Sequence, residues 1–158
     1  TDIALAAQLG KQKNPDCLVL VDNTFLGPVF QAPFLHDADV VLYSATKFMG
    51  GHSDLVAGVV LTAKSATGHD WMSKINHYRT ILGPVVSPDT TWMLTRSLET
   101  VWLRMERQAQ KAQQVAAALV THPRVEQVLF PGHYEYSSDR MTTEEQPQKT
   151  KLWARQYH

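Results

Sequence analysis

The stretch CLVLVDNT at residues 17–24 decides the fold that we expect for this chain. Its first five residues, from Cys17 to Val21, are apolar at consecutive positions, and Asp22 begins an abrupt polar ending. Consecutive apolar residues, rather than alternating ones, are typical of a strand in a parallel sheet that helices cover on both faces. The pattern therefore predicts an α/β fold.

A second strand of the same character is expected at residues 39–44, with the apolar centre Val40, Val41 and Leu42. It also ends in polar residues, SATK at positions 44–47. A short helix that Thr1 and Asp2 can cap should precede the first strand. The third apolar run, at residues 55–61, follows too closely for a helical crossover, which allows it to run antiparallel.

A long helix is expected further along the chain. Ser87-Pro88-Asp89 predicts its start, because serine is favoured as the N-cap and proline at the first helical position. Apolar residues then recur at three- and four-residue steps from Leu94 to Leu119. The pattern predicts one helix of about 30 residues that ends before Pro123 and joins two domains. We expect a strand at residues 125–130, and loop or disorder from Tyr134 onward.

The composition excludes several classes of protein. Of the 158 residues, 15 are Lys or Arg and 15 are Asp or Glu, and this balance argues against a nucleic-acid partner. The longest apolar run is far shorter than the about 20 residues of a membrane span. Cys17 is the single cysteine, so a disulfide framework or a CxxC site cannot form. We therefore expect a cytoplasmic protein without a membrane segment.

Side chains that can carry chemistry follow the first two strands, where ligands bind in doubly wound sheets. They are Asp22 after one strand and Ser44, Thr46 and Lys47 after the other. A plain ion pair between Asp22 and Lys47 is one interpretation. The two hydroxyls, and the small residues in GGHSD at 50–54, favour a phosphorylated aldehyde cofactor instead. A lysine amine can form a Schiff base with it, and a carboxylate can keep a pyridine nitrogen protonated.

His52 and Asp54 resemble a pair of metal ligands. A zinc site needs at least a third protein ligand, and none is visible near them in the sequence. We predict no metal site, and we interpret His52 as a hydrogen-bonding loop residue. Trp92, Met93, Trp102 and Met105 lie at core-like spacing on the expected long helix and are interpreted as core or interface residues.

The segments VDNTF at 21–25, SATKF at 44–48 and GHSD at 51–54 together resemble the Cys/Met metabolism family of enzymes. This family includes cystathionine γ-synthase, cystathionine γ-lyase and methionine γ-lyase, and its cofactor is pyridoxal 5'-phosphate. The resemblance covers about residues 1 to 133. It implies that Lys47 holds the cofactor as a Schiff base and moves protons, that Asp22 pairs with the ring nitrogen, and that Ser44 and Thr46 bind the phosphate.

The resemblance also implies an organisation of the chain. The fold would be that of fold type I pyridoxal-phosphate enzymes, with a mostly parallel sheet in the large domain. Residues 1–86 would form the later part of this cofactor-binding domain. Residues 87–122 would be the interdomain helix, and residues 123–158 the beginning of a C-terminal domain. We expect the chain to be a fragment of a longer polypeptide that forms a homotetramer built from dimers.

The function that the resemblance favours is transsulfuration-type chemistry at the γ-carbon of sulfur amino acids, as in a carbon–sulfur lyase acting on methionine or cystathionine. One alternative is a γ-replacement transferase, a cystathionine γ-synthase or O-acylhomoserine sulfhydrylase, which takes an O-acylated homoserine. An alternative of another class is an inactive fragment with only a structural or interaction role.

Overall fold

The structure is a computed structural model that describes residues 2–63 and 70–130. The chain divides into two compact units, Thr1–Trp102 and Leu103–His158. The helices and strands follow in the order α1 (Ile3–Lys13), β1 (Leu20–Asp22), α2 (Gly27–Phe30), the 3-10 helix η1 (Pro33–His36), β2 (Val40–Ser44), β3 (Gly58–Thr62), α3 (Trp71–Leu82), α4 (Pro88–Leu98) and α5 (Val101–Val120).

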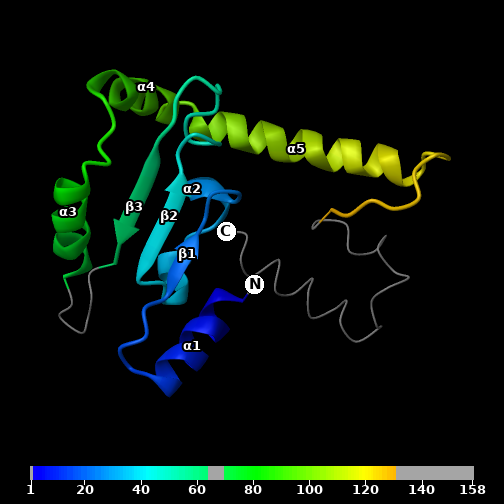
Figure 1. Ribbon diagram of the computed structural model, residues 1–158. Helices are drawn as coiled ribbons and strands as arrows, with labels where there is room; N and C mark the ends of the chain where they lie inside the picture. The colour runs from blue at the N-terminus through cyan, green and yellow to red at the C-terminus, as the bar shows by residue number, and fades with distance from the viewer. Residues whose placement is uncertain (1, 64–69, 131–158) are drawn as a thin grey trace. The chain divides into compact units, whose positions relative to one another are not determined.

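The described strands form one sheet in the order β1-β2-β3 (Figure 1). β1 runs parallel to β2, with Asp22 opposite Leu42. β3 runs antiparallel to β2, with Val59 opposite Tyr43. The sheet is therefore mixed, and the antiparallel third strand agrees with the short connection before it.

The hydrophobic core of the first unit lies against one face of this sheet. Ile3 of α1, Ala38, Val41 and Tyr43 are buried together, and Val19, Val21, Met49 and Val59 pack around them. The strand residues in this cluster occupy alternate positions, because successive side chains of a strand point to opposite faces. α1 begins at an N-cap, Asp2, whose carboxylate accepts the backbone N–H of Leu5.

The opposite face of β1 is not covered by any described element. Leu18 and Leu20 are 39% and 52% exposed. The expectation that both faces of this strand are covered is thus wrong for the described residues. The physical reason is that the core containing Ile3 of α1 packs against one face of the sheet only.

The predicted long helix is two helices. α4 ends at Leu98, and α5 begins at Val101. Between them, the backbone N–H groups of Glu99 and Thr100 bond to the carbonyls of Arg96 and Ser97, three residues back. These tighter i→i−3 bonds interrupt the i→i−4 hydrogen bonds of the helix. The apolar pattern runs through the interruption, which is why the sequence predicted a single helix. Ser87 caps α4 as predicted, by accepting the N–H of Thr90.

The strand expected at residues 125–130 does not form, because no described segment pairs with it. The prediction of loop or disorder from Tyr134 onward lies outside the described residues. The boundaries proposed for the large domain, the interdomain segment and the C-terminal domain stay predictions.

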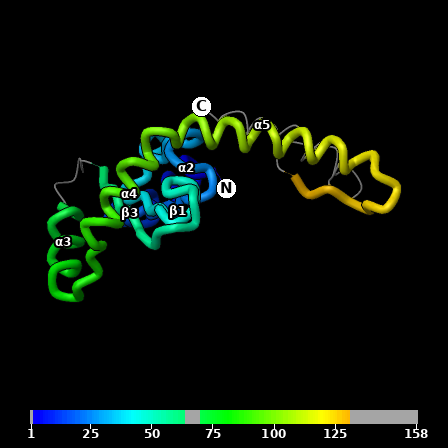
Figure 2. The backbone as a smooth tube through the Cα atoms, turned by 90° about the horizontal axis from the view of Figure 1, so that it is seen from above, coloured from blue at the N-terminus to red at the C-terminus, as the bar shows by residue number. Residues whose placement is uncertain are grey.

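Helix α3 lies beside β3, at the end of the sheet away from β1, in both views of the backbone (Figures 1 and 2). Asp70 caps its beginning, and Gly83, with a φ of 74°, follows its end in the left-handed conformation. Across the described part of the chain, no helix combines the length and hydrophobicity that a membrane span needs.

Candidate functional site

The register of β1 and β2 brings Asp22 and Ser44 to the same edge of the sheet. Asp22 lies opposite Leu42, two residues before Ser44. Because side chains alternate along a strand, Asp22 and Ser44 lie on the face opposite to the core residues Val41 and Tyr43. Asp22 is exposed and Ser44 is partly exposed. This arrangement leaves both side chains accessible to a ligand.

Thr24 connects these two strand ends through its hydroxyl. The hydroxyl donates to Oδ1 of Asp22 at 2.6 Å, and the backbone N–H of Thr24 donates to the same oxygen at 3.0 Å. The backbone N–H of Ser44 in turn donates to the Thr24 hydroxyl at 2.8 Å. The hydroxyl bond, followed by the backbone bond, holds the pKa of the Asp22 carboxyl below its usual range. The carboxylate is therefore ionised at neutral pH.

A turn directly after β2 fixes the backbone of Lys47. Its N–H donates to the carbonyl of Ser44 at 3.0 Å, and its carbonyl accepts the N–H of Gly51 at 2.7 Å. Met49, two residues later, packs against the hydrophobic core. The Lys47 side chain is exposed. The amine is thus carried on a turn that is held by hydrogen bonds on one side and by the core on the other.

Thr46 is bound to the chain just before β3. Its hydroxyl oxygen accepts the N–H of Ala57 at 3.0 Å and donates to the carbonyl of the same residue at 3.3 Å. Its backbone N–H also donates to that carbonyl, at 3.2 Å. The hydroxyl can keep its bond from the Ala57 N–H while its proton turns toward a ligand, since the longer bond is the weaker of the two.

Asn23 anchors the turn that presents Asp22 and Thr24. Its Nδ2 donates to the carbonyls of Gly27 and Gln31 at 2.9 and 3.1 Å, and it lies 3.2 Å from the hydroxyl of Tyr43. Its side chain is almost fully buried, at 2% exposure. Its backbone N–H continues the ladder to Leu42. The chain on both sides of the Asp22 carboxylate is therefore held rigidly.

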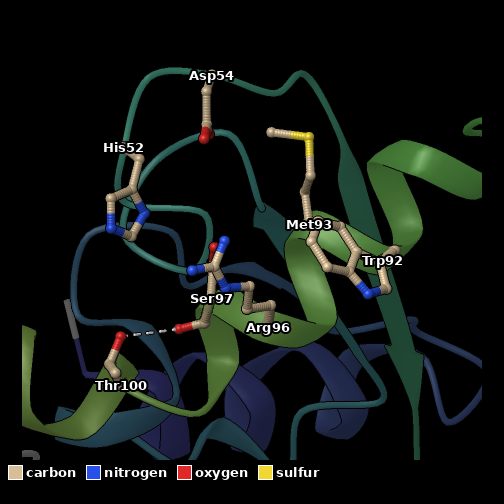
Figure 3. A pocket seen from close by; sticks show the side chains of 7 residues that line it. All are labelled: His52, Asp54, Trp92, Met93, Arg96, Ser97 and Thr100. Atoms are coloured by element: carbon tan, nitrogen blue, oxygen red, sulfur yellow. Dashed lines mark hydrogen bonds between the residues drawn. The ribbon is translucent and has the colours of Figure 1, made fainter.

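A pocket of about 390 Å³ lies beside the loop that follows Lys47 (Figure 3). Its lining comes from that loop, through His52 and Asp54, and from α4 and the turn after it, through Trp92, Met93, Arg96, Ser97 and Thr100. The Arg96 guanidinium stacks over the Trp92 ring at 5.7 Å. His52 bonds through Nδ1 to the carbonyl of Gly50 at 2.7 Å, which confirms its interpretation as a hydrogen-bonding loop residue.

The two tryptophans predicted as core or interface residues are exposed, Trp92 by 64% and Trp102 by 59%. Neither belongs to the core of the described residues, and the interface interpretation stays a prediction for them. Met105 is buried, as the core interpretation predicts. Within residues 2–63 and 70–130, no three His, Cys, Asp or Glu side chains gather in a way that could hold a metal ion.

The structure thus brings Asp22 and Ser44 together through Thr24, and it carries Thr46 and Lys47 on the turn that continues from Ser44. Sequence reasoning missed Thr24 and Asn23. Both stand in the same VDNT motif as Asp22. Their contacts depend on the pairing of β1 with β2, which the motif itself does not reveal.

The chain is similar in sequence to enzymes of sulfur amino-acid metabolism. Cystathionine gamma-lyase of Bacillus subtilis (strain 168) is 41% identical over 132 residues, which are 84% of this chain and 33% of that protein. Cystathionine gamma-synthase/O-acetylhomoserine (thiol)-lyase of the same organism is 38% identical over 144 residues, 91% of this chain and 37% of that protein. The chain spans about a third of the length of these curated relatives.

The solved structure of cystathionine gamma-lyase from Lactobacillus plantarum, complexed with L-serine, superimposes with a TM-score of 0.81 at 32% identity. The match covers 100% of this chain and 37% of that one. The fold is accordingly the α/β fold of type I pyridoxal-phosphate enzymes. The sequence profile described as "Cys/Met metabolism PLP-dependent enzyme" matches residues 1–152. The chain therefore belongs to the Cys/Met metabolism family of enzymes, whose cofactor is pyridoxal 5'-phosphate.

Proposed function

We propose that the protein carries out transsulfuration-type chemistry at the γ-carbon of sulfur amino acids, as a carbon–sulfur lyase of the methionine or cystathionine γ-lyase type. The observation that carries this proposal is the combination of an ionised carboxylate, two hydroxyls and an exposed amine at one edge of the sheet. The relatives that match the chain include a cystathionine gamma-lyase and an L-methionine gamma-lyase, and these names supply the substrate class.

The chemistry of these side chains fits pyridoxal phosphate. The Asp22 carboxylate is exposed and ionised, which suits a partner for a protonated ring nitrogen. Ser44 and Thr46 offer two short hydroxyl donors, which suit a phosphate. Lys47 offers an exposed primary amine on a fixed turn. When bound, the cofactor supplies a conjugated ring that delocalises negative charge formed at the substrate Cα.

Each of the chain's own residues has a distinct task in this proposal. Lys47 holds the cofactor and, once the substrate amine has displaced it, takes the proton from Cα and returns protons to neighbouring carbons. Asp22, as an anion, would pair with the ring nitrogen and favour its protonated form. Ser44 and Thr46 orient the cofactor from its phosphate end, which keeps its reactive carbon within reach of Lys47.

A γ-replacement transferase is the second candidate. The relative named cystathionine gamma-synthase/O-acetylhomoserine (thiol)-lyase matches 91% of the chain, more than the 84% matched by the gamma-lyase of the same organism. Elimination and replacement would use Asp22, Ser44, Thr46 and Lys47 in the same way. They differ in whether water or a thiol completes the reaction. The third candidate is a fragment without activity of its own.

Cofactor attachment is the first test of the proposal. The purified protein is incubated with pyridoxal phosphate, reduced with borohydride and digested, and the modified lysine is located by mass spectrometry. We expect the label on Lys47, no label in Lys47→Ala, and normal labelling in Lys13→Ala, an exposed lysine at the end of α1. A label spread over several lysines, or none on the wild-type protein, would contradict the assignment.

Substrate assays then separate the three candidates. A lyase acting on cystathionine and water releases cysteine, ammonia and 2-oxobutyrate. A replacement enzyme joins O-acylhomoserine to cysteine and releases the carboxylic acid, without ammonia. Release of 2-oxobutyrate together with ammonia from cystathionine by the wild-type protein, and not by Lys47→Ala, supports the γ-lyase, whereas pyruvate with ammonia would show cleavage at the β-carbon. Cofactor attachment with neither reaction would favour the inactive fragment. The cytoplasmic location and the homotetramer stay predictions.

A further inference from the structure

One hydroxyl group sits between the two residues that we assign to opposite ends of the cofactor. Thr24 Oγ1 donates to Asp22 Oδ1 at 2.6 Å and accepts the backbone N–H of Ser44 at 2.8 Å. A hydroxyl has one proton to give. Because the Ser44 N–H is a donor and the Asp22 carboxylate is an acceptor, the direction of both bonds is fixed. Thr24 thus connects the Asp22 carboxylate to Ser44, where the turn that carries Thr46 and Lys47 begins.

The chain on both sides of Thr24 is held, so the hydroxyl has little freedom to turn away. On one side, the buried Asn23 ties the turn after β1 to the carbonyls of Gly27 and Gln31. On the other, the carbonyl of Ser44 accepts the N–H of Lys47 and so continues the connection to the amine. A shift of Asp22 at the end of β1 would therefore also displace Ser44 at the end of β2, and the reverse.

We propose that Thr24 is a positioning residue that couples Asp22 to Ser44, so that the contacts to the cofactor ring and to its phosphate are held in one fixed arrangement. This inference rests on the proposed function. Both hydrogen bonds from Thr24 fall on Oδ1 of Asp22. Oδ2 lies outside these two bonds and would be the oxygen available to the ring nitrogen, while Oδ1 is held by Thr24.

Thr24 also affects the charge of Asp22, in addition to its position. Its hydroxyl is the largest cause of the lowered pKa of the Asp22 carboxyl. A more acidic carboxyl group leaves the shared proton on the ring nitrogen rather than taking it. The hydroxyl therefore favours the protonated ring, which is the form that accepts charge from the substrate. A residue that served only to pack the turn would not have this effect.

Three single variants of the purified protein test the coupling, together with Asp22→Asn alone and combined with Thr24→Val. Thr24→Val removes the hydroxyl at nearly constant volume, and Thr24→Ser retains it. Thr80→Val is the matched control, because the Thr80 hydroxyl bonds only to the carbonyl of Asn76 on the exposed helix α3. Dissociation constants are measured for pyridoxal phosphate and for pyridoxal, which lacks the phosphate. The Asp22 carboxyl pKa is measured by NMR without cofactor.

We expect Thr24→Val to weaken pyridoxal phosphate binding by about tenfold, the effect of losing one charge-assisted hydrogen bond in an accessible site. The loss should be smaller for pyridoxal, which has no phosphate end to couple. Thr24→Ser and Thr80→Val should bind within about twofold of the wild-type protein. Adding Asp22→Asn to Thr24→Val should cost less than the sum of the two single changes.

Several results would overturn the coupling: unchanged binding in Thr24→Val, equal losses for both ligands, no rescue by Thr24→Ser, or additive losses in the double variant. The NMR titration separates this failure from a failure of the proposed function. If the wild-type protein binds no pyridoxal phosphate, the proposed function fails. A raised Asp22 pKa in Thr24→Val but not Thr24→Ser then still supports the contact, whereas an unchanged pKa overturns it.

Discussion

Two aspartates lie at opposite ends of the parallel strands β1 and β2, and they are bound in opposite ways. Asp39, just before β2, uses both oxygens on distant parts of the chain. Oδ2 accepts the backbone N–H of Val19 at 2.9 Å, and Oδ1 forms an ion pair with Lys11 of α1 at 3.2 Å. Among the described residues, Asp22 at the end of β1 is bound through one oxygen by Thr24, two residues away.

The difference indicates that the end of the sheet at Asp39 serves the stability of the fold, whereas the end at Asp22 carries the candidate site. Asp39 fastens a helix and two strands together, and its side chain is 25% exposed. Asp22 is exposed, carries a pKa lowered by local bonds and keeps one oxygen outside those bonds. The same residue type therefore stabilises the fold at one end, and at the other it is the group to which the proposed function assigns a ligand contact. In α/β folds the carboxyl ends of parallel strands are the ligand-binding side, which agrees with this division.

The largest effect on stability is expected from Asp39→Ala. It leaves the Val19 N–H without its acceptor and removes the ion pair, so the free energy of unfolding should fall by about 2–3 kcal/mol. Urea denaturation of the purified protein measures this loss. Asp39→Asn is the control, because an amide oxygen can still accept the Val19 N–H, and we expect it to lose less. A change in cofactor affinity without a change in stability would break the division between the two ends.

A smaller effect is expected from Lys11→Met. Methionine preserves most of the aliphatic side chain but removes the ammonium group that contacts Asp39 and the carbonyl of Asp37. A partly exposed ion pair contributes about 0.5–1 kcal/mol, so the unfolding free energy should fall by about this amount. The loss should shrink in 1 M salt, because mobile ions screen exposed charges. A loss equal to that of Asp39→Ala would show that the ion pair, not the bond to Val19, dominates.

Local sequence patterns were sufficient for the parts of the structure that depend on neighbouring residues. The strand ends at Asp22 and Ser44 and the cap at Ser87 can each be predicted from a few consecutive positions. The break between α4 and α5 could not be predicted, because neither Gly nor Pro marks it and the apolar period continues through Thr100. Helix α3 was also missed, although Trp71, Ile75, Tyr78 and Leu82 recur along it at three- and four-residue steps.

Contacts between segments were the other part that sequence could not supply. The role of Thr24 requires that β1 and β2 pair with Asp22 opposite Leu42, and a motif of five residues carries no information about register. The exposed side of β1 has the same origin. Consecutive apolar residues indicate a strand that can be covered on both faces, but not which elements cover it.

A third, smaller effect is expected from Asp22→Asn, which tests the other side of the comparison. Because Asp22 is exposed and its hydrogen bonds within the described part of the chain are the two from Thr24, the unfolding free energy at neutral pH should change by no more than about 0.5 kcal/mol. Binding of pyridoxal phosphate should weaken by about tenfold or more, through loss of the charge beside the ring nitrogen. Stability is measured by urea denaturation and affinity by titration. A stability loss as large as that of Asp39→Ala would mean that both ends are structural.

The smallest effect concerns pH. The Thr24 hydroxyl and N–H lower the pKa of Asp22 in the folded protein relative to the unfolded chain. A carboxyl group shifted in this direction stabilises the fold above its unfolded pKa, and the contribution disappears as the pH falls through the lower, folded pKa. The small stability advantage of the wild-type protein over Asp22→Asn should therefore be constant above about pH 5 and shrink below about pH 4. Denaturant titrations at a series of pH values measure it. An advantage that grew on acidification would require a raised pKa, and would remove Thr24 as the group that keeps this carboxylate charged.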